Sequence, residues 1–146
     1  MTRNRDLSPL EQWGFVVLFG LLSAGLWFGW FAWDTDYQYH GYYATSTGER
    51  TGPYESWQGI GAFLCSLPVI GLAYRILHFV VALVILPMSF TLAWISTASV
   101  IATGPLWAVG AMYVAVGTTG GVAILLAIAA GIERHVKRRH KKLAAT

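Results

Sequence analysis

The chain has 146 residues and a formal net charge of +3 at pH 7, and 55% of its residues are hydrophobic whereas only 12% are charged. A soluble domain usually carries about 25% charged residues, so this composition excludes an ordinary water-soluble globular protein. No charged side chain lies within residues 13–33, and only Arg75 and His78 interrupt the apolar stretch of residues 57–132. Uncharged runs of about 18 or more residues are typical of transmembrane helices.

The first predicted span covers residues 9–33 and follows a cytoplasmic N-terminus, residues 1–8. Residues 8–11 (Ser-Pro-Leu-Glu) have the form of a capping box with proline at the first helical position, which predicts a helix start at the proline. Arg3 and Arg5 ahead of a hydrophobic segment are also typical of a secretory signal. The segment is longer than the roughly 7–15 residues of a signal core and has no small-residue cleavage pattern, so we expect a retained anchor.

The first loop, residues 34–52, is rich in tyrosine and threonine, which favour extended structure. With a turn at residues 48–50 it is compatible with a short extracytoplasmic β-hairpin, which would have to lie on the helix ends or on a partner because two strands alone are marginal in water. The alternative is an aromatic belt at the level of the lipid headgroups, which Trp27, Trp30, Trp33, Trp57 and Trp107 would continue. The residues that we expect to bind a partner are Tyr39, Tyr42, Tyr43, Arg50 and Trp57.

The same loop contains the only candidate metal ligands, because imidazole and carboxylate groups suit zinc. His40 lies near Asp34 and Asp36, but there is no second histidine at ligand spacing, so we expect no metal and no cofactor. The sequence has no hydrolase, kinase or dinucleotide-binding motif, and the glycine-rich residues 117–121 lack the lysine that follows a phosphate-binding loop. We therefore expect no enzymatic activity.

The second and third predicted spans cover residues 53–74 and 77–101, with a cytoplasmic turn at residues 75–76. A glycine–proline pair at the start of the second span repeats the pattern of a proline at the first helical position. Pro68 and Pro87 lie inside the two spans, where each removes a backbone hydrogen bond, so we expect both helices to be kinked.

An uncharged extracytoplasmic turn, residues 102–104, precedes the fourth predicted span, residues 105–132, and a basic cytoplasmic tail, residues 133–146. The tail can prolong the fourth helix, with Glu133 and Lys137 correctly ordered for an i,i+4 ion pair. Each basic residue beside an inner leaflet can add about 1 kcal/mol of attraction to anionic lipid, and the alternative is that these residues serve only as a topology signal. The candidate lipid-binding residues are Arg134, Lys137, Arg138, Arg139, Lys141 and Lys142.

Small residues suggest where helices pack closely. Gly25 and Gly29 form one GxxxG pair, and Gly117 and Gly121 form another; such pairs let helix backbones approach within a bundle or between subunits. We expect close packing within the chain. Cys65 is the only cysteine, which excludes an intramolecular disulfide, and we expect it to be buried in the packing.

The orientation follows from the basic residues, which gather at both termini and at Arg75, whereas the first loop has Arg50 alone against several acidic residues. Both termini and the turn at Arg75 should therefore be cytoplasmic. Residues 52–58 (Gly-Pro-Tyr-Glu-Ser-Trp-Gln), at the start of a hydrophobic helix after a polar loop, resemble a segment of small uncharacterised four-helix membrane proteins of actinobacteria. The resemblance covers this heptapeptide and the hydropathy outline; it implies a bacterial plasma membrane and transfers no catalytic residue.

These patterns together predict an all-α membrane protein, a bundle of four transmembrane helices. No charged side chain lies deep within a predicted span, which disfavours ion- or proton-coupled transport. We expect a non-enzymatic accessory or scaffolding subunit of a larger envelope complex. The alternative is a small oligomeric channel or facilitator whose pore is shaped by the kinks at Pro68 and Pro87, and a membrane enzyme working through His40 comes third. The expected partners are membrane lipids and either another membrane protein or a second copy of the chain, and nucleic acid is not among them.

Overall fold

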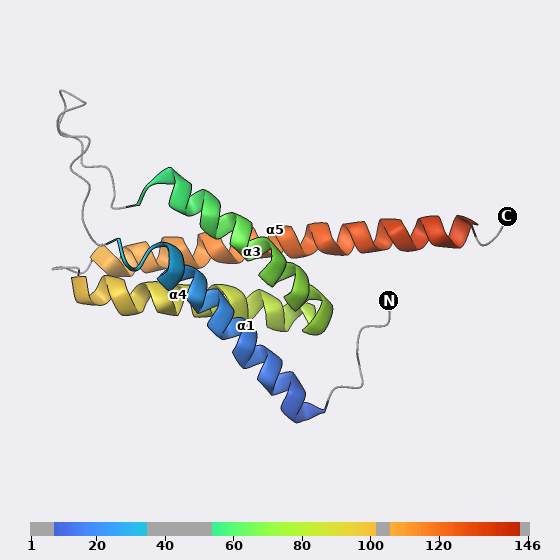
Figure 1. The fold of residues 1–146 in the computed structure, drawn as a ribbon, viewed down its shortest axis with the longest axis horizontal. Coiled ribbons are helices and arrows are strands. Elements are labelled where there is room, and N and C mark those ends of the chain that lie inside the picture. The colour runs from blue at the N-terminus through green and yellow to red at the C-terminus, as the bar shows by residue number, and fades with distance from the viewer. Residues whose placement is uncertain (1–7, 35–53, 102–105, 144–146) are drawn as a thin grey trace, which may run out of the picture.

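The computed structural model describes residues 8–34, 54–101 and 106–143 (Figure 1). These residues form four helices and no strand: α1 (Pro9–Trp30), α3 (Ser56–Ile76), α4 (Phe79–Ile101) and α5 (Leu106–Leu143). Each helix is long and apolar enough to cross a membrane, which makes the chain a multi-pass membrane protein. The predicted all-helical class with four apolar helices is confirmed. The hairpin expected in the first loop falls on residues outside the described ranges, and nothing among the described residues supports it.

The start of α1 is the predicted capping box. The hydroxyl of Ser8 accepts a hydrogen bond from the backbone N–H of Glu11 at 3.4 Å, and the Glu11 carboxylate accepts one from the backbone N–H of Ser8 at 2.7 Å. This reciprocal pair satisfies N–H groups that the first turn of a helix leaves without partners. The helix ends at Trp30, three residues before the predicted end of the span, because residues 31–33 form a turn.

The other helices are shifted slightly from their predicted ranges. Helix α3 begins at Ser56 rather than at the proline three residues earlier, since Glu55 is its N-cap and donates its backbone N–H to Oε1 of Gln58 at 2.7 Å. The connection to α4 consists of Leu77 and His78 rather than residues 75–76. Leu77 is only 5% exposed, so its side chain fixes this turn in the core. Helix α5 continues without a break to Leu143, which confirms that the tail prolongs it.

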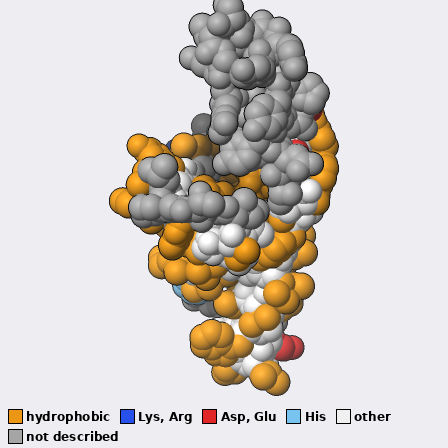
Figure 2. Space-filling view, turned by 90° about the vertical axis from the view of Figure 1, so that its left-hand side faces the viewer, with side chains coloured by type: hydrophobic (Ala, Val, Ile, Leu, Met, Phe, Trp, Pro, Cys, Tyr) orange, Lys and Arg blue, Asp and Glu red, His pale blue; other side chains and the backbone are white. Residues whose placement is uncertain are grey.

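Helices α3 and α4 each pack against the other three helices, α4 most extensively against α1 and α5, whereas α1 and α5 do not pack against each other. Figure 1 shows α4 and α5 running side by side, with α1 and α3 crossing them obliquely. The core is small and consists of Phe19, Ile70, Ala73, Leu77, Ala82, Leu86 and Leu126. Most of the described surface visible in Figure 2 is hydrophobic, as expected for helices that face lipid rather than water.

Two expectations about packing are wrong. At Gly25, Gly29, Gly117 and Gly121 an added Cβ would meet no heavy atom within 4 Å, so these glycines do not pack closely within the chain. Cys65 is exposed on α3 rather than buried. Both errors have one cause: when lipid covers the outside, apolar and small residues occur on outward and inward faces alike, and spacing does not tell which face is which.

Glycine does permit close contacts elsewhere, beside tryptophan rings and a serine. A Cβ on Gly110 would lie 2.7 Å from the ring of Trp94, and one on Gly61 would collide with the ring of Trp30. A Cβ on Gly20 would lie 3.0 Å from the hydroxyl oxygen of Ser89. These glycines make room for side chains of neighbouring helices, a role that GxxxG spacing does not signal.

Candidate functional site

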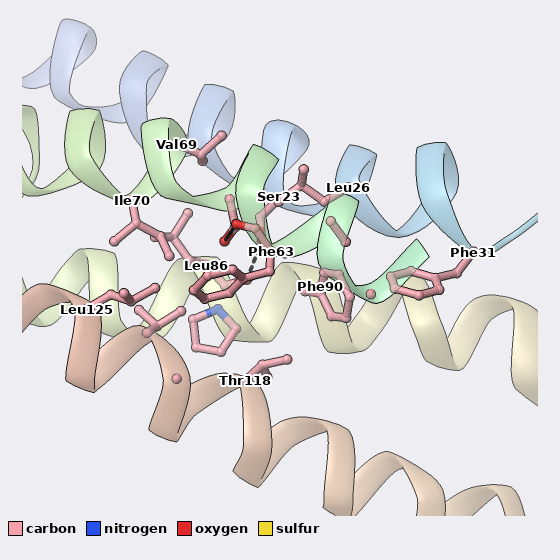
Figure 3. Close-up of a pocket in the computed structure, with 16 residues that line it drawn as sticks. Ser23, Leu26, Phe31, Phe63, Val69, Ile70, Leu86, Phe90, Thr118 and Leu125 are labelled. Carbon is pink, nitrogen blue, oxygen red and sulfur yellow. Dashed lines mark hydrogen bonds between the residues drawn. The ribbon is translucent and has the colours of Figure 1, made fainter. Parts of the chain in front are cut away.

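A cavity of about 270 Å³ lies between the four helices. Figure 3 shows side chains from every helix around it, with Phe31 and Phe90 at one end and Ile70 and Leu125 at the other. We call the end of the bundle where α1 ends and α3 begins the loop end, and the end where α5 continues to Leu143 the tail end. The cavity extends from the loop end towards the middle of the spans.

The cavity exists because α3 and α5 diverge. Towards the tail end they are held together: Ile70 and Ala73 of α3 share the core with Leu126 of α5, and the Tyr74 hydroxyl donates to the Glu133 carboxylate at 2.7 Å. Towards the loop end the start of α3 lies well away from α5 (Figure 1). Helices α1 and α5 do not pack against each other either, so a wedge-shaped space remains between α1, α3 and α5, with α4 as its base.

The wall of the cavity is incomplete where α3 and α5 diverge. Gly59 and Phe63 of α3 and Gly121 of α5 line the cavity and are also exposed at the protein surface. An added Cβ at Gly59 or Gly121 would meet no heavy atom within 4 Å, so the two glycines leave space that side chains would otherwise occupy. The cavity therefore opens sideways, on a surface made of membrane-spanning helices.

The hydroxyl groups in the cavity wall have already donated their hydrogens to backbone carbonyls. Ser23 donates to the carbonyl of Leu86 at 2.6 Å, Ser66 to that of Phe63 at 2.7 Å, and Thr118 to that of Val114 at 2.6 Å. The remaining lining residues are apolar or glycine. The wall thus has no free hydroxyl hydrogen and no charge with which to recognise a polar solute, and it suits an apolar one.

Trp27 packs against Phe31 and Phe90, which line the cavity at the loop end. Its ring lies 5.1 Å from that of Phe31, 5.9 Å from that of Phe90 and 6.4 Å from that of Trp94, measured between centroids. Its indole N–H donates to the Thr97 hydroxyl at 3.0 Å, and the residue is only 3% exposed. The sequence offered Trp27 as part of an interfacial belt, one of two alternatives for this region. In the structure it is the centre of an aromatic cluster that joins α1 to α4.

Gln58 is a structural residue that the sequence did not single out. Its side chain is fully buried, its amide Nε2 donates to the Asp34 carboxylate at 2.8 Å, and its Oε1 accepts from the backbone of Glu55 at 2.7 Å. Gln58 therefore ties the turn after α1 to the start of α3. The available signal was the Glu-x-x-Gln spacing of residues 55–58, a variant of the capping box.

The predicted partner-binding residues are only partly described. Tyr39, Tyr42, Tyr43 and Arg50 lie outside the described residues, as do His40 and Asp36. Trp57 is half exposed; its indole N–H donates to the Glu55 carboxylate at 2.5 Å, and its ring lies 6.1 Å from that of Trp30 and 6.3 Å from that of Trp33.

Metal-ligating side chains do not gather in the described part of the chain. Asp34, which the sequence grouped with His40, bonds to Gln58. No group of three or more histidine, cysteine, aspartate or glutamate residues within residues 8–34, 54–101 and 106–143 is arranged to hold a metal ion.

The basic tail is a helical arm. The predicted ion pair between Glu133 and Lys137 is present at 2.6 Å. Helix α5 has 38 residues, about 57 Å at 1.5 Å per residue, which is longer than the roughly 30 Å of the hydrocarbon core. Figure 1 shows its C-terminal end extending past the other helices. The exposed basic residues on this arm are Arg134, Lys137, Arg138 and Arg139, and the side chains of Lys141 and Lys142 lie outside the described set.

Comparison of the chain with protein-family models, curated proteins and solved structures finds no match.

Proposed function

We propose that the chain is a non-enzymatic accessory or scaffolding subunit of a larger envelope complex, inserted in a bacterial plasma membrane with both termini in the cytoplasm. The observation that carries this proposal is one uncovered face of α5. Tyr113 is 77% exposed, Val116 is 73% exposed, and Gly117 and Gly120 lie beside them with no heavy atom near an added Cβ. Bulky side chains next to glycines form ridges and grooves, into which a neighbouring membrane helix can pack.

The exposed glycines of α1 and α5 have an energetic cost. Glycine inside a helix is less favourable than alanine by about 0.5–1 kcal/mol, and here nothing within the described chain repays that cost. Contact with a helix of another protein would repay it, because the backbones can then approach closely. Gly117 and the pair Gly25 and Gly29, which do not pack within the chain, are therefore proposed to contact other chains.

The orientation rests on the distribution of basic residues. Helix α1 begins and α5 ends at the tail end (Figure 1), which supports the proposal that both termini lie on one side of the membrane. The exposed basic arm after Glu133 is placed in the cytoplasm, beside the anionic lipids of the inner leaflet.

A small oligomeric channel or facilitator remains the alternative. Pro87 lines the cavity, but Pro68 is exposed on α3 and does not, so the two prolines do not share one lining. The hydroxyl groups of that lining are already bonded to the backbone. These observations favour the accessory role over a water-filled path.

Purification of a tagged chain from its host in a mild detergent, followed by mass spectrometry, tests the proposal. We expect another membrane protein in stoichiometric amount, and we expect Gly117→Leu to lower its recovery. The matched control is Gly71→Leu, because Gly71 is also exposed with no heavy atom near an added Cβ but lies on α3. A homo-oligomer that passes solutes in proteoliposomes would overturn the accessory role.

A further inference from the structure

We propose that the cavity between the four helices binds one acyl chain of a bilayer phospholipid, which enters sideways between α3 and α5. The proposal concerns a ligand of this chain alone. It does not rest on the accessory role, because purified chain in a lipid bilayer suffices to test it.

The size of the cavity suits a hydrocarbon chain. An apolar protein cavity of about 150 Å³ stays dry and takes up benzene. The present cavity, at about 270 Å³, is nearly twice as large. A segment of an acyl chain fills it, and a whole lipid headgroup is not needed.

The chemistry of the wall selects an apolar ligand. Ser23, Ser66 and Thr118 have each committed their hydroxyl hydrogen to a backbone carbonyl, and no charged side chain lines the cavity. Water in such a space would lose most of its hydrogen bonds, so the cavity is more favourably filled by hydrocarbon. A sugar, nucleotide or ion would find no free hydrogen-bond donor and no charged side chain there, because the three hydroxyl groups can only accept.

The position of the opening indicates that the ligand comes from the lipid bilayer. Phe63 and Gly121 line it, and both lie well inside helices that cross the membrane rather than at their ends. Phe63 is 53% exposed, so its ring forms an outer edge of the opening. At this depth the surrounding medium is lipid hydrocarbon, which makes a phospholipid acyl chain the ligand present at by far the highest concentration.

The wall opposite the opening is held in place before any ligand arrives. The hydrogen bond from Ser23 to Leu86 fixes α1 against α4, and the ring cluster around Trp27 fixes the same two helices at the loop end. A preformed wall lowers the ordering cost of binding, because only the acyl chain has to become ordered.

The test uses purified full-length chain in phosphatidylethanolamine and phosphatidylglycerol liposomes that contain a trace of phospholipid with a diazirine on one acyl chain. After irradiation, adducts are mapped by mass spectrometry. We expect adducts on Leu86, which is 2% exposed and lines the cavity, in addition to adducts on outward positions such as Leu92, which is 58% exposed. Lipid at the outer surface reaches Leu92 but not Leu86.

Two variants fill the cavity without disturbing the backbone, because an added Cβ has free space at both positions: Gly121→Leu from α5 and Gly59→Leu from α3. We expect each to lower adducts on Leu86 by about tenfold, equivalent to about 1.4 kcal/mol of binding, while adducts on Leu92 stay constant. The matched control is Gly120→Leu, since Gly120 is equally open but does not line the cavity.

Far-ultraviolet circular dichroism identifies any variant that misfolds, and having two filling variants on different helices keeps the test decisive if one of them does. Absence of Leu86 adducts in the unaltered chain would overturn the proposal. So would equal labelling of Leu86 in Gly120→Leu and in both filling variants. Failure to recover any protein partner in the detergent purification, with these adducts present, would count against the accessory role only.

Discussion

Replacing Trp27 with alanine should destabilise the bundle more than replacing any other described tryptophan. The residue is 3% exposed and its ring contacts those of Phe31, Tyr54, Phe90 and Trp94. Truncating a buried tryptophan in a water-soluble protein costs about 3–5 kcal/mol. Part of that cost is transfer from water, which is absent when the unfolded helices stay in lipid.

The cost in a membrane therefore comes from packing and hydrogen bonding. Four ring pairs at about 0.5–1 kcal/mol each give roughly 2–4 kcal/mol, and an interhelical hydrogen bond such as that from Trp27 to Thr97 adds about 0.6 kcal/mol. We expect Trp27→Ala to lower the free energy of unfolding by about 2.5–4.5 kcal/mol. Trp27→Phe keeps a ring and should cost about 1 kcal/mol.

The assay is unfolding in dodecyl maltoside micelles titrated with sodium dodecyl sulfate and followed by near-ultraviolet circular dichroism, which reports the fixed packing of aromatic rings rather than helix content. Trp33→Ala is the control, because Trp33 is 59% exposed and its indole N–H bonds only to the carbonyl of Gly29 one turn earlier. The control should cost less than about 1 kcal/mol. Equal losses for Trp27→Ala and Trp33→Ala would refute the assignment of Trp27 as the centre of the cluster.

Three further predictions concern topology, a buried amide and the basic arm. Reporter fusions after Arg5, Arg75 and Lys142 should give cytoplasmic signals and those after Thr47 and Gly104 external ones; a cytoplasmic signal at Thr47 or an external one at Lys142 would contradict the orientation. Gln58→Leu should cost about 1–3 kcal/mol in the same titration, because the Asp34 carboxylate and the Glu55 N–H lose their partner, and an unchanged midpoint would show that these bonds contribute nothing. A peptide covering residues 133–146 should sediment with anionic liposomes and lose that binding as salt rises, since exposed attraction is screened beyond about 10 Å at 0.1 M; salt-independent binding would exclude an electrostatic cause.

The elements that could be predicted are those set by local sequence. Uncharged runs gave the four helices, and the reciprocal bonds of Ser8 and Glu11 placed the start of α1. The ion pair of Glu133 and Lys137 follows from helical spacing alone. In each case the determining contacts lie within one turn of helix, so no knowledge of the tertiary arrangement was needed.

The features that could not be predicted depend on which face of a helix meets a neighbour. Trp27 and Trp33 lie in one apolar segment, yet one is buried in the bundle and the other is exposed. Gly121 lines a cavity although its spacing to Gly117 indicated helix packing. The cavity itself results from the divergence of α3 and α5, a property of crossing angles that no local pattern encodes.

A photo-crosslinking amino acid placed at Val116, in the uncovered face of α5, tests the proposed accessory role most directly. Irradiation of intact host membranes should join the chain to another integral membrane protein. The same amino acid at Leu72, which is 53% exposed on α3 and outside the proposed contact, should not do so. Adducts with lipid alone, or only with a second copy of the chain, would contradict the account.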